Sequence, residues 1–430
     1  MAGIYVHVPF CRKKCVYCDF FSVGASQEML SAYADLVTKE FKAREGELAK
    51  EPVRTVYFGG GTPSLLPVGD IGRILGAFPC MTADAEVTIE VNPDDVTRDF
   101  AMAVRETGVN RVSMGVQSFD DRELAFLHRR HDAAGAVRAV GHLRSAGFDD
   151  ISIDLIYGIP GQTMASWEKS IEMAMLLDTP HLSSYCLSYE EGTQLTRMRD
   201  RGDFTVCPDE LCVAMYERMA EVVAAHGYEQ YEISNYSKPG WESRHNSAYW
   251  DFTPYLGLGA SAHSFDGKVR RYNPASLRRY MEAIEQKGVA FEEEHETDNE
   301  LYNEWVMTKL RTRRGMDVTE LAQRFGEARA KFAGEVLGRY AKDGCVECDG
   351  SRVRLTRKGV MVSDAISFMP VIAMVENRVI VAPPSTHCGI VVKIAENLGI
   401  RPASSKNPPA KAKTTRLTTL FVVTIPTFCE

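Results

Sequence analysis

Short apolar runs alternate with longer amphipathic stretches through the first half of this chain. The apolar runs predict strands over 3–8, 53–58, 85–91, 109–116, 149–156 and 181–187. Apolar residues at helical spacing predict helices over 26–45, 97–107, 120–146 and 165–177. Regular alternation of this kind indicates a parallel sheet with helices outside it. The expected fold class is therefore α/β, with reactive groups near the carboxyl ends of the strands.

The second half of the chain has a different pattern. A helix is expected over 209–225 and a strand over 230–236, and charged residues then gather over 286–299. Beyond them, helical patterns precede a hairpin whose tight turn is Asp349-Gly350. Helices followed by a hairpin are typical of a winged helix. The expected domains and tail are 1–290, 298–368 and an atypical tail over 370–430.

That tail has the composition of a flexible segment. Residues 370–430 hold seven of the 19 prolines, with seven Lys or Arg against three acids. The stretch 403–415 is low in apolar residues. We assign no chemistry to the tail and expect it to be poorly ordered.

Composition excludes some classes of protein. The net charge of −8 disfavours a general nucleic-acid or anionic-membrane binder. No signal peptide is visible, and no apolar run reaches the about 18 residues of a transmembrane helix. Eleven cysteines without an export signal indicate a reducing compartment and metal chemistry. A cytoplasmic location is expected.

Three cysteines lie close together just after the first predicted strand. Cys11, Cys15 and Cys18 follow Pro9, which ends that strand. Three thiols on one loop can hold three irons of a [4Fe–4S] cluster and leave the fourth iron open to a small chelating cofactor. A catalytic zinc, a redox thiol pair and three unrelated core cysteines remain alternatives. Structural zinc and a disulfide framework are disfavoured, because no matching second pair follows and one thiol would be left over.

The spacing of these cysteines, with Tyr17 directly before the last, resembles the cluster loop of the radical S-adenosylmethionine (SAM) superfamily. The string from Tyr5 to Phe20 is similar to the family that contains oxygen-independent coproporphyrinogen III oxidases and haem chaperones. The resemblance covers about residues 1–368. It implies a partial (β/α)6 barrel, a winged-helix-like C-terminal domain, a [4Fe–4S] cluster and SAM. Oxidases of this family carry a further cysteine where this chain has Phe20, and a segment before the cluster strand, which here starts at Gly3.

A glycine run follows the second predicted strand and ends in Gly61, Thr62 and Pro63. Glycines let a backbone approach a ligand closely, although many such runs are only turns. The run lacks the Walker A and Rossmann spacings. The resemblance assigns this stretch to the methionine amino group of SAM.

Polar side chains near three later strand ends are further candidate SAM contacts. By resemblance, Glu90 pairs with a cationic group of SAM, Gln117 contacts the cofactor, and Asp154 binds the ribose hydroxyls. Arg129 matches the arginine near the SAM carboxylate, because a guanidinium suits planar carboxylate recognition. Arg130 is adjacent, so the choice between the two arginines stays open.

Aromatic residues and histidines complete the candidate site. Tyr5 and Tyr17 either flank the cluster and the adenine or are core aromatics. His245 begins a His-Asn-x-x-Tyr-Trp string that resembles a signature of the haem chaperones. Histidine can ligate haem iron, and nearby aromatics can stack on a macrocycle, although a lone histidine is more often structural. His263 is a second, weaker candidate, and Cys186 at the sixth strand end is expected to be a small buried residue.

The resemblance implies cleavage of SAM by a reduced cluster, which gives methionine and a 5′-deoxyadenosyl radical. The first hypothesis is a chaperone that binds haem or porphyrin and passes haem to an acceptor protein. The alternative is an enzyme that decarboxylates coproporphyrinogen III oxidatively to protoporphyrinogen IX. Either would take electrons from a donor such as flavodoxin or ferredoxin. A nucleic-acid function of the winged domain is not favoured.

Overall fold

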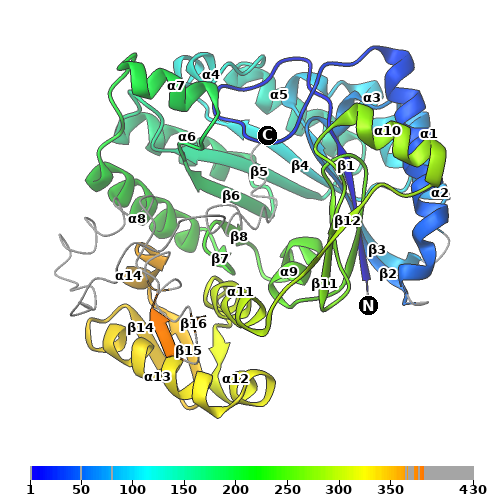
Figure 1. Cartoon of the computed structure of the whole chain (residues 1–430). Coiled ribbons are helices and arrows are strands. Elements are labelled where there is room, and N and C mark those ends of the chain that lie inside the picture. The colour runs from blue at the N-terminus through cyan, green and yellow to red at the C-terminus, as the bar shows by residue number, and fades with distance from the viewer. Residues whose placement is uncertain are drawn as a thin grey trace. The chain divides into compact units, whose positions relative to one another are not determined.

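A sheet of twelve strands organises most of the chain in the computed structural model (Figure 1). The structure describes residues 2–48, 51–78, 81–363, 366, 372–375 and 378–381. The chain divides into two compact units between His295 and Glu296. Each unit is described by itself.

Six parallel strands form the centre of the first unit, and they lie side by side in chain order. They are β1 (Ala2–Val8), β2 (Val53–Gly60), β3 (Met81–Val91), β4 (Arg111–Gln117), β5 (Asp150–Tyr157) and β6 (His181–Cys186). At the two edges of this set, β1 pairs with β9 and β6 pairs antiparallel with β8, so the sheet does not close on itself. The predicted α/β fold with a partial barrel of six strands is confirmed.

Helices connect these strands and cover the outer face of the sheet (Figure 1). They are α1 (Gln27–Arg44), α2 (Val68–Gly76), α3 (Arg98–Glu106), α4 (Asp121–Phe126), α5 (Ala133–Ser145) and α6 (Met164–Leu177), with the short 3₁₀ helices η1 (Glu45–Leu48), η2 (Pro63–Leu65) and η3 (Pro93–Asp95). The helical stretch expected over 120–146 is divided into two helices, α4 and α5. His128 has a φ of 61°, which no right-handed helix accepts, and Asp132 caps a new helix through the backbone N–H of Gly135.

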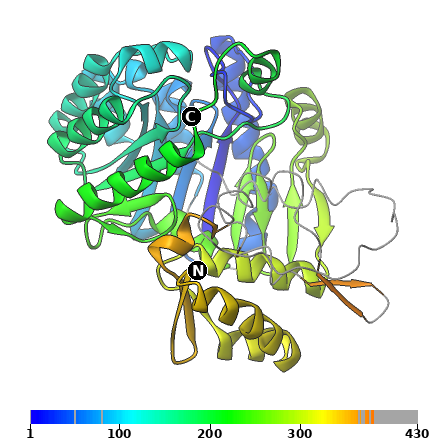
Figure 2. The same ribbon diagram turned by 90° about the vertical axis from the view of Figure 1, so that its left-hand side faces the viewer.

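The rest of the first unit extends the sheet at both edges. It comprises α7 (Gln194–Arg201), α8 (Asp209–Ala225), β7 (Glu229–Gln230), β8 (Asn235–Ser237), α9 (Arg244–Trp250), β9 (Tyr255–Leu258), β10 (His263–Phe265), β11 (Val269–Tyr272), α10 (Leu277–Lys287) and β12 (Glu292–His295). The strand expected over 230–236 is wrong, because the chain reverses there and β7 pairs antiparallel with β8. Figure 2 shows β9 to β12 as an array beside β1.

A buried ion pair ties α1 to this array. Arg44 lies 2.9 Å from Glu40, one helical turn earlier, and donates to the carbonyl oxygen of Gly257 at 3.0 Å. Glu40 in turn accepts from the hydroxyl of Tyr280 on α10 at 2.8 Å. Removing one partner of such a buried pair typically costs about 3–5 kcal/mol. The extension is therefore an integral part of the first unit.

The second unit has the order helix, strand, two helices and hairpin. Its elements are α11 (Asp298–Leu310), β13 (Met316–Asp317), α12 (Val318–Phe325), α13 (Glu327–Lys342), β14 (Val346–Asp349), β15 (Arg352–Leu355) and α14 (Arg357–Val360). The three strands form a small sheet in the order β13-β15-β14. This arrangement confirms the predicted winged-helix-like α+β domain.

Most of the tail expected to be flexible, 370–430, lies outside the described residues. Its described part is the antiparallel pair β16 (Ile372–Val375) and β17 (Arg378–Val381). No helix in the described part of the chain is both long and apolar enough to cross a membrane.

Candidate functional site

The cysteine loop is held where it leaves β1. The carbonyl oxygens of Val8 and Phe10 accept hydrogen bonds from the backbone N–H groups of Gly61 and Thr62, at 2.9 and 2.7 Å. A Cβ on Gly61 would lie 2.7 to 2.8 Å from backbone atoms of Phe10 and Val8. Only glycine therefore lets the segment after β2 lie against the start of the loop without displacing it.

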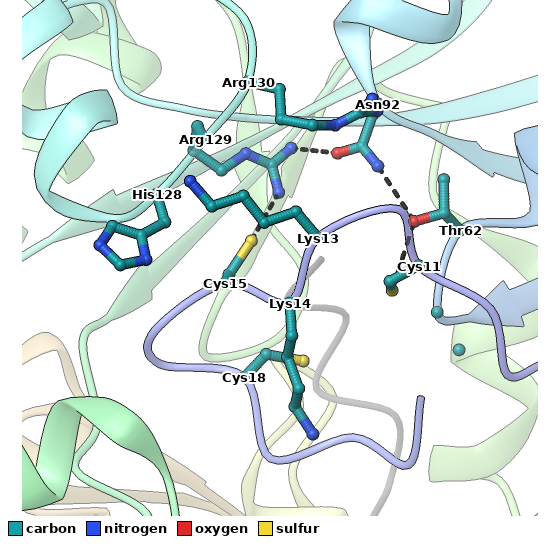
Figure 3. Close-up of a pocket in the computed structure, with 12 residues that line it drawn as sticks. Cys11, Lys13, Lys14, Cys15, Cys18, Thr62, Asn92, His128, Arg129 and Arg130 are labelled. Carbon is teal, nitrogen blue, oxygen red and sulfur yellow. Dashed lines mark hydrogen bonds between the residues drawn. The ribbon is translucent and has the colours of Figure 1, made fainter. Parts of the chain in front are cut away.

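All three cysteines of the loop line one pocket (Figure 3). Segments that follow β2, β3 and β4 complete the wall, so the pocket lies at the carboxyl ends of the parallel strands. The lining residues are Cys11, Lys13, Lys14, Cys15, Cys18, Gly60, Gly61, Thr62, Asn92, His128, Arg129 and Arg130.

A continuous chain of hydrogen bonds joins two of the thiols across these strand ends (Figure 3). The Thr62 hydroxyl donates to the Cys11 sulfur at 3.5 Å and accepts from the Asn92 amide at 3.1 Å. The Asn92 carbonyl accepts from Arg129 at 2.5 Å, and Arg129 also donates to the Cys15 sulfur at 3.4 Å. Three side chains from three strand ends thus set the positions of two sulfur atoms.

The structure separates the two adjacent arginines. Arg129 points to the thiols and donates a further hydrogen bond to the carbonyl oxygen of Gly115 on β4 at 2.5 Å. Arg130 lines the same pocket, but it pairs with Asp94 at 2.5 Å and with Asp95 at 3.2 Å. The guanidinium directed at the cysteine loop is that of Arg129, so Arg129 is the better placed to receive the carboxylate of a ligand bound at the thiols.

The donor set at this pocket fits an iron–sulfur cluster. Three thiols line the pocket, and hydrogen bonds from a hydroxyl and a guanidinium to sulfur stabilise an anionic thiolate. Burial and the neighbouring thiol of Cys15 raise the pKa of Cys18 to about 12. Binding of iron must therefore displace the Cys18 proton, as metal binding by thiols generally does.

Glu90 lies at the end of β3, just beneath the glycine run. Its carboxylate accepts from the Tyr57 hydroxyl at 2.8 Å and from the Gly60 N–H at 3.2 Å. Burial raises its pKa to about 8, against the opposing effect of the Tyr57 hydrogen bond. A ligand cation beside Glu90 would favour its charged form.

Asp154 and Gln117 occupy neighbouring strands. Asp154 accepts hydrogen bonds from Ser113 at 3.2 Å and from Ser152 at 3.4 Å, and burial raises its pKa to about 6. Gln117 is fully buried at an irregularity in the pairing of β4 with β5, with a φ of 68°. Such a backbone is strained for a residue other than glycine, and strained residues cluster at functional sites. Neither side chain lines the cysteine pocket.

The remaining small-residue and aromatic candidates lie around the pocket and not in its wall. Pro63 is buried at the start of η2. The Tyr5 hydroxyl shares a hydrogen bond with Nδ1 of His7 at 3.1 Å. Tyr17 packs in an apolar cluster that contains Leu127 and Leu195. Tyr17 therefore has the surroundings of a core aromatic, one of the two roles left open from the sequence.

The ring of His245 is engaged at both nitrogens. Nδ1 shares a hydrogen bond with the Thr55 hydroxyl and Nε2 with the Tyr249 hydroxyl, each at 2.9 Å. The ring is 1% exposed and stacks on Tyr57 with centroids 5.0 Å apart. Burial lowers its pKa to about 3, so the ring is neutral. Ligation of haem iron by His245 remains a prediction, and it would require one of these hydrogen bonds to break.

His263 is more available. It begins β10, its ring is partly exposed, and no hydrogen bond to its ring nitrogens is found among the described residues. Its ring lies 5.9 Å from that of Tyr272. Burial lowers its pKa to about 4, so the ring is neutral near pH 7 and has a nitrogen lone pair for a metal.

Sequence reasoning missed Asn92. Its amide links Thr62 to Arg129, and without it the chain of hydrogen bonds between the two thiols is broken. The available signal was its place directly after β3, at the same sheet edge as the cysteine loop.

Two family models match this chain. The Radical SAM superfamily matches residues 5–174, and the HemN C-terminal domain matches residues 297–362.

Curated relatives match over most of the chain. "Heme chaperone HemW" of Bacillus subtilis is 32% identical over 371 residues, which cover 85% of this chain and 98% of that protein. The protein of the same name from Mycobacterium tuberculosis is 34% identical over 372 residues, or 85% of this chain and 93% of its own length. Among solved structures, coproporphyrinogen III oxidase (HemN) from Escherichia coli superposes with a TM-score of 0.75 at 25% identity, over 86% of this chain and 90% of that one.

Proposed function

Because this chain belongs to the HemW family of radical SAM proteins, we propose that it is a haem chaperone that binds a [4Fe–4S] cluster, SAM and haem. The observation that supports this function most strongly is the 32% identity that spans 98% of the B. subtilis heme chaperone. A match over 85% of this chain reaches both of the regions that the family models match, residues 5–174 and 297–362. The proposal is therefore made for the whole chain and not for the barrel alone.

Cys11, Cys15 and Cys18 hold the cluster in this proposal. When bound, the cluster and SAM supply one-electron cleavage of a carbon–sulfur bond. The Arg129 and Thr62 hydrogen bonds to two of the sulfurs stabilise negative charge on them and orient them. Electrons would come from a reduced donor such as flavodoxin or ferredoxin.

The strand ends around the pocket bind SAM. Arg129 receives the carboxylate, and the backbone around Gly61 and Thr62 approaches the amino group. Glu90 offers a buried carboxylate to a cationic group, and its hydrogen bonds from Tyr57 and Gly60 hold it in place. Asp154 accepts from the ribose hydroxyls in place of the serine hydroxyls that it now binds.

Haem binds through a histidine of the first unit. Of the two candidates, His263 has the ring that can coordinate iron without losing a hydrogen bond among the described residues, and we favour it for that reason. His245 stays an alternative that requires a rearrangement of Tyr249 or Thr55. The bound haem is then passed to an acceptor protein.

The second candidate function is that of a coproporphyrinogen III oxidase, because the E. coli enzyme superposes on this chain with a TM-score of 0.75. The reconstituted protein is mixed anaerobically with haem, and separately with coproporphyrinogen III, SAM and a reductant. A shifted haem Soret band without decarboxylated product supports the chaperone. Vinyl-bearing porphyrin product together with an unshifted Soret band would overturn it in favour of the oxidase.

A further inference from the structure

Three thiols that the cluster does not use lie together near the carboxyl ends of β5 and β6. Cys212, in the first turn of α8, has the thiols of Cys186 and Cys207 as electrostatic neighbours. A Cβ placed on Gly158 would lie 3.0 Å from the Cys212 sulfur and 3.5 Å from the Cys186 sulfur. The two sulfurs therefore lie against the same point of the backbone, although Cys186 and Cys212 are 26 positions apart in the chain.

Two of these thiols, those of Cys186 and Cys212, lie at the two ends of one segment. We call residues 187–211 the strap; it contains α7 and runs from Cys186 at the end of β6 to Cys212. The strap contacts the cysteine loop of the cluster directly, since the Leu195 N–H donates to the carbonyl oxygen of Val16 at 2.7 Å. Leu195 and Leu187 also belong to the apolar cluster of Val16 and Tyr17. A disulfide between the ends of the strap would therefore restrict the motion of a segment that contacts the cluster loop.

We propose that Cys186 and Cys212 form a reversible disulfide that fixes the strap over the cluster loop. The oxidant is a low-molecular-weight disulfide such as oxidised glutathione. The Cys186 thiolate attacks one of its sulfurs, and one glutathione thiolate leaves. The Cys212 thiolate then attacks the Cys186 sulfur, and the second glutathione thiolate leaves. Two protein thiols are oxidised, one glutathione disulfide is reduced, and the two thiol protons pass to the two leaving thiolates.

Exposure decides the order of these steps. Cys186, expected from the sequence to be buried, is exposed at the end of β6, whereas Cys212 is partly buried and Cys207 is buried. Cys186 is therefore the thiol that an external disulfide can reach. The neighbouring Cys186 thiol and burial both raise the pKa of Cys212. Cys207 is buried, and only the sulfurs of Cys212 and Cys186 lie against Gly158, so Cys212 is the nearer partner for Cys186.

Peptide mapping tests the disulfide on the cluster-loaded protein. The protein is incubated anaerobically with oxidised glutathione, its free thiols are alkylated, and tryptic peptides are analysed by mass spectrometry. Trypsin places Cys186 in the peptide 170–197, and both Cys207 and Cys212 in the peptide 202–218. We expect these two peptides to be joined in most chains, with one alkylated cysteine left in the second, and to separate after reduction. Separate peptides, or a disulfide internal to 202–218, would overturn the proposal.

Three variants make the assignment specific. Cys186→Ser, at an exposed position, and Cys212→Ala should each lose the joined peptides. Cys348→Ser, at an exposed cysteine of the second unit, should keep them. Circular dichroism and iron content, both unchanged, show that each variant is folded. Joined peptides that persist in either of the first two variants would contradict the pairing.

The effect on the strap is measured by hydrogen exchange. In the oxidised protein, amides of the strap, including that of Leu195, should exchange several-fold more slowly than in the reduced protein. Cys212→Ala should show no such difference between the two conditions. Equal exchange in the oxidised and reduced wild-type protein would mean that the bond does not fix the strap.

Discussion

Arg129 donates a hydrogen bond to the sulfur of Cys15 at 3.4 Å, although the two residues lie 114 positions apart in the chain. The same guanidinium binds the side chain of Asn92 and the backbone of Gly115. The cysteine loop and the ends of β3 and β4 are thereby fixed to one another before any ligand arrives. Such preorganisation reduces the cost of ordering the site when a ligand binds.

Replacement of Arg129 by lysine should separate SAM binding from cluster binding. Arg129→Lys keeps the positive charge but loses the ability to form bidentate hydrogen bonds with a carboxylate. Loss of a hydrogen bond to a charged group costs about 1.5–3 kcal/mol, which should weaken SAM binding about 10–100-fold. The measurement is a SAM titration of the reconstituted protein, with iron content determined in parallel. Arg130→Lys is the matched control and should change SAM affinity little, because Arg130 pairs with Asp94 and Asp95.

A methyl group at Gly61 should disturb the start of the cluster loop. Gly61→Ala places a Cβ within 2.8 Å of three backbone atoms, and backbone cannot rotate away as a side chain can. Overpacking of this kind costs about 1–3 kcal/mol. We expect a lower melting temperature and less iron per chain after reconstitution. Gly69→Ala, in α2 with nothing within 4 Å of its added Cβ, should leave both quantities unchanged or raise the melting temperature slightly.

Glu90 should make the stability of the cluster-free protein depend on pH. Its pKa in the folded protein is about 8, against a usual value of 4.5, so the folded state keeps a proton that the unfolded state loses between these pH values. The stabilising contribution of neutral Glu90 is complete below about pH 4.5 and is lost as the pH rises through about 8. Its slope is at most about 1.4 kcal/mol per pH unit.

Denaturant unfolding of the wild type and of Glu90→Gln from pH 5 to 9 checks this prediction. Other buried groups titrate in both proteins, so the difference between the two free energies of unfolding isolates Glu90. As the pH rises, the wild type should lose stability relative to Glu90→Gln. Glu172→Gln, at an exposed position on α6, should run parallel to the wild type. A difference that is constant across the range would refute the raised pKa.

Substitution of His263 and substitution of His245 should affect haem affinity differently. His263→Ala should weaken haem binding about tenfold or more and shift the Soret band. His245→Gln preserves hydrogen-bonding capacity toward Thr55 and Tyr249 and should leave haem affinity close to that of the wild type. Haem titrations followed by absorbance measure both. Weaker haem binding by His245→Gln, together with unchanged binding by His263→Ala, would identify His245 as the ligand. It would also show that the hydrogen bonds of His245 with Thr55 and Tyr249 break when haem binds.

The central sheet was predictable because its six strands are long and apolar. The strand expected over 53–58 extends over Val53–Gly60, and the helix expected over 209–225 is α8, Asp209–Ala225. By contrast, β11 and β12 were missed, since Val269–Tyr272 and Glu292–His295 are short, largely polar and without alternation. These two strands form through their pairing with β10 and with each other, which periodicity does not report.

Candidate site residues were visible where a local string carries the chemistry. Cys11, Cys15 and Cys18 are close in sequence, and the structure places them on one pocket. Asn92 comes directly after β3, which indicates its place at this sheet edge, but its role depends on contacts with Thr62 and with a residue 37 positions later, which no local pattern indicates. The surroundings of His245 were likewise hidden, because its partner Thr55 lies 190 positions away.

The most direct test of the account is a spectrum of the reduced, anaerobically reconstituted cluster with and without SAM. If three cysteines hold the cluster and one iron is open, electron paramagnetic resonance of the wild type should change on addition of SAM, while Cys15→Ser should lose most of its iron and sulfide. A cluster whose spectrum is indifferent to SAM, or full iron content in Cys15→Ser, would contradict the account.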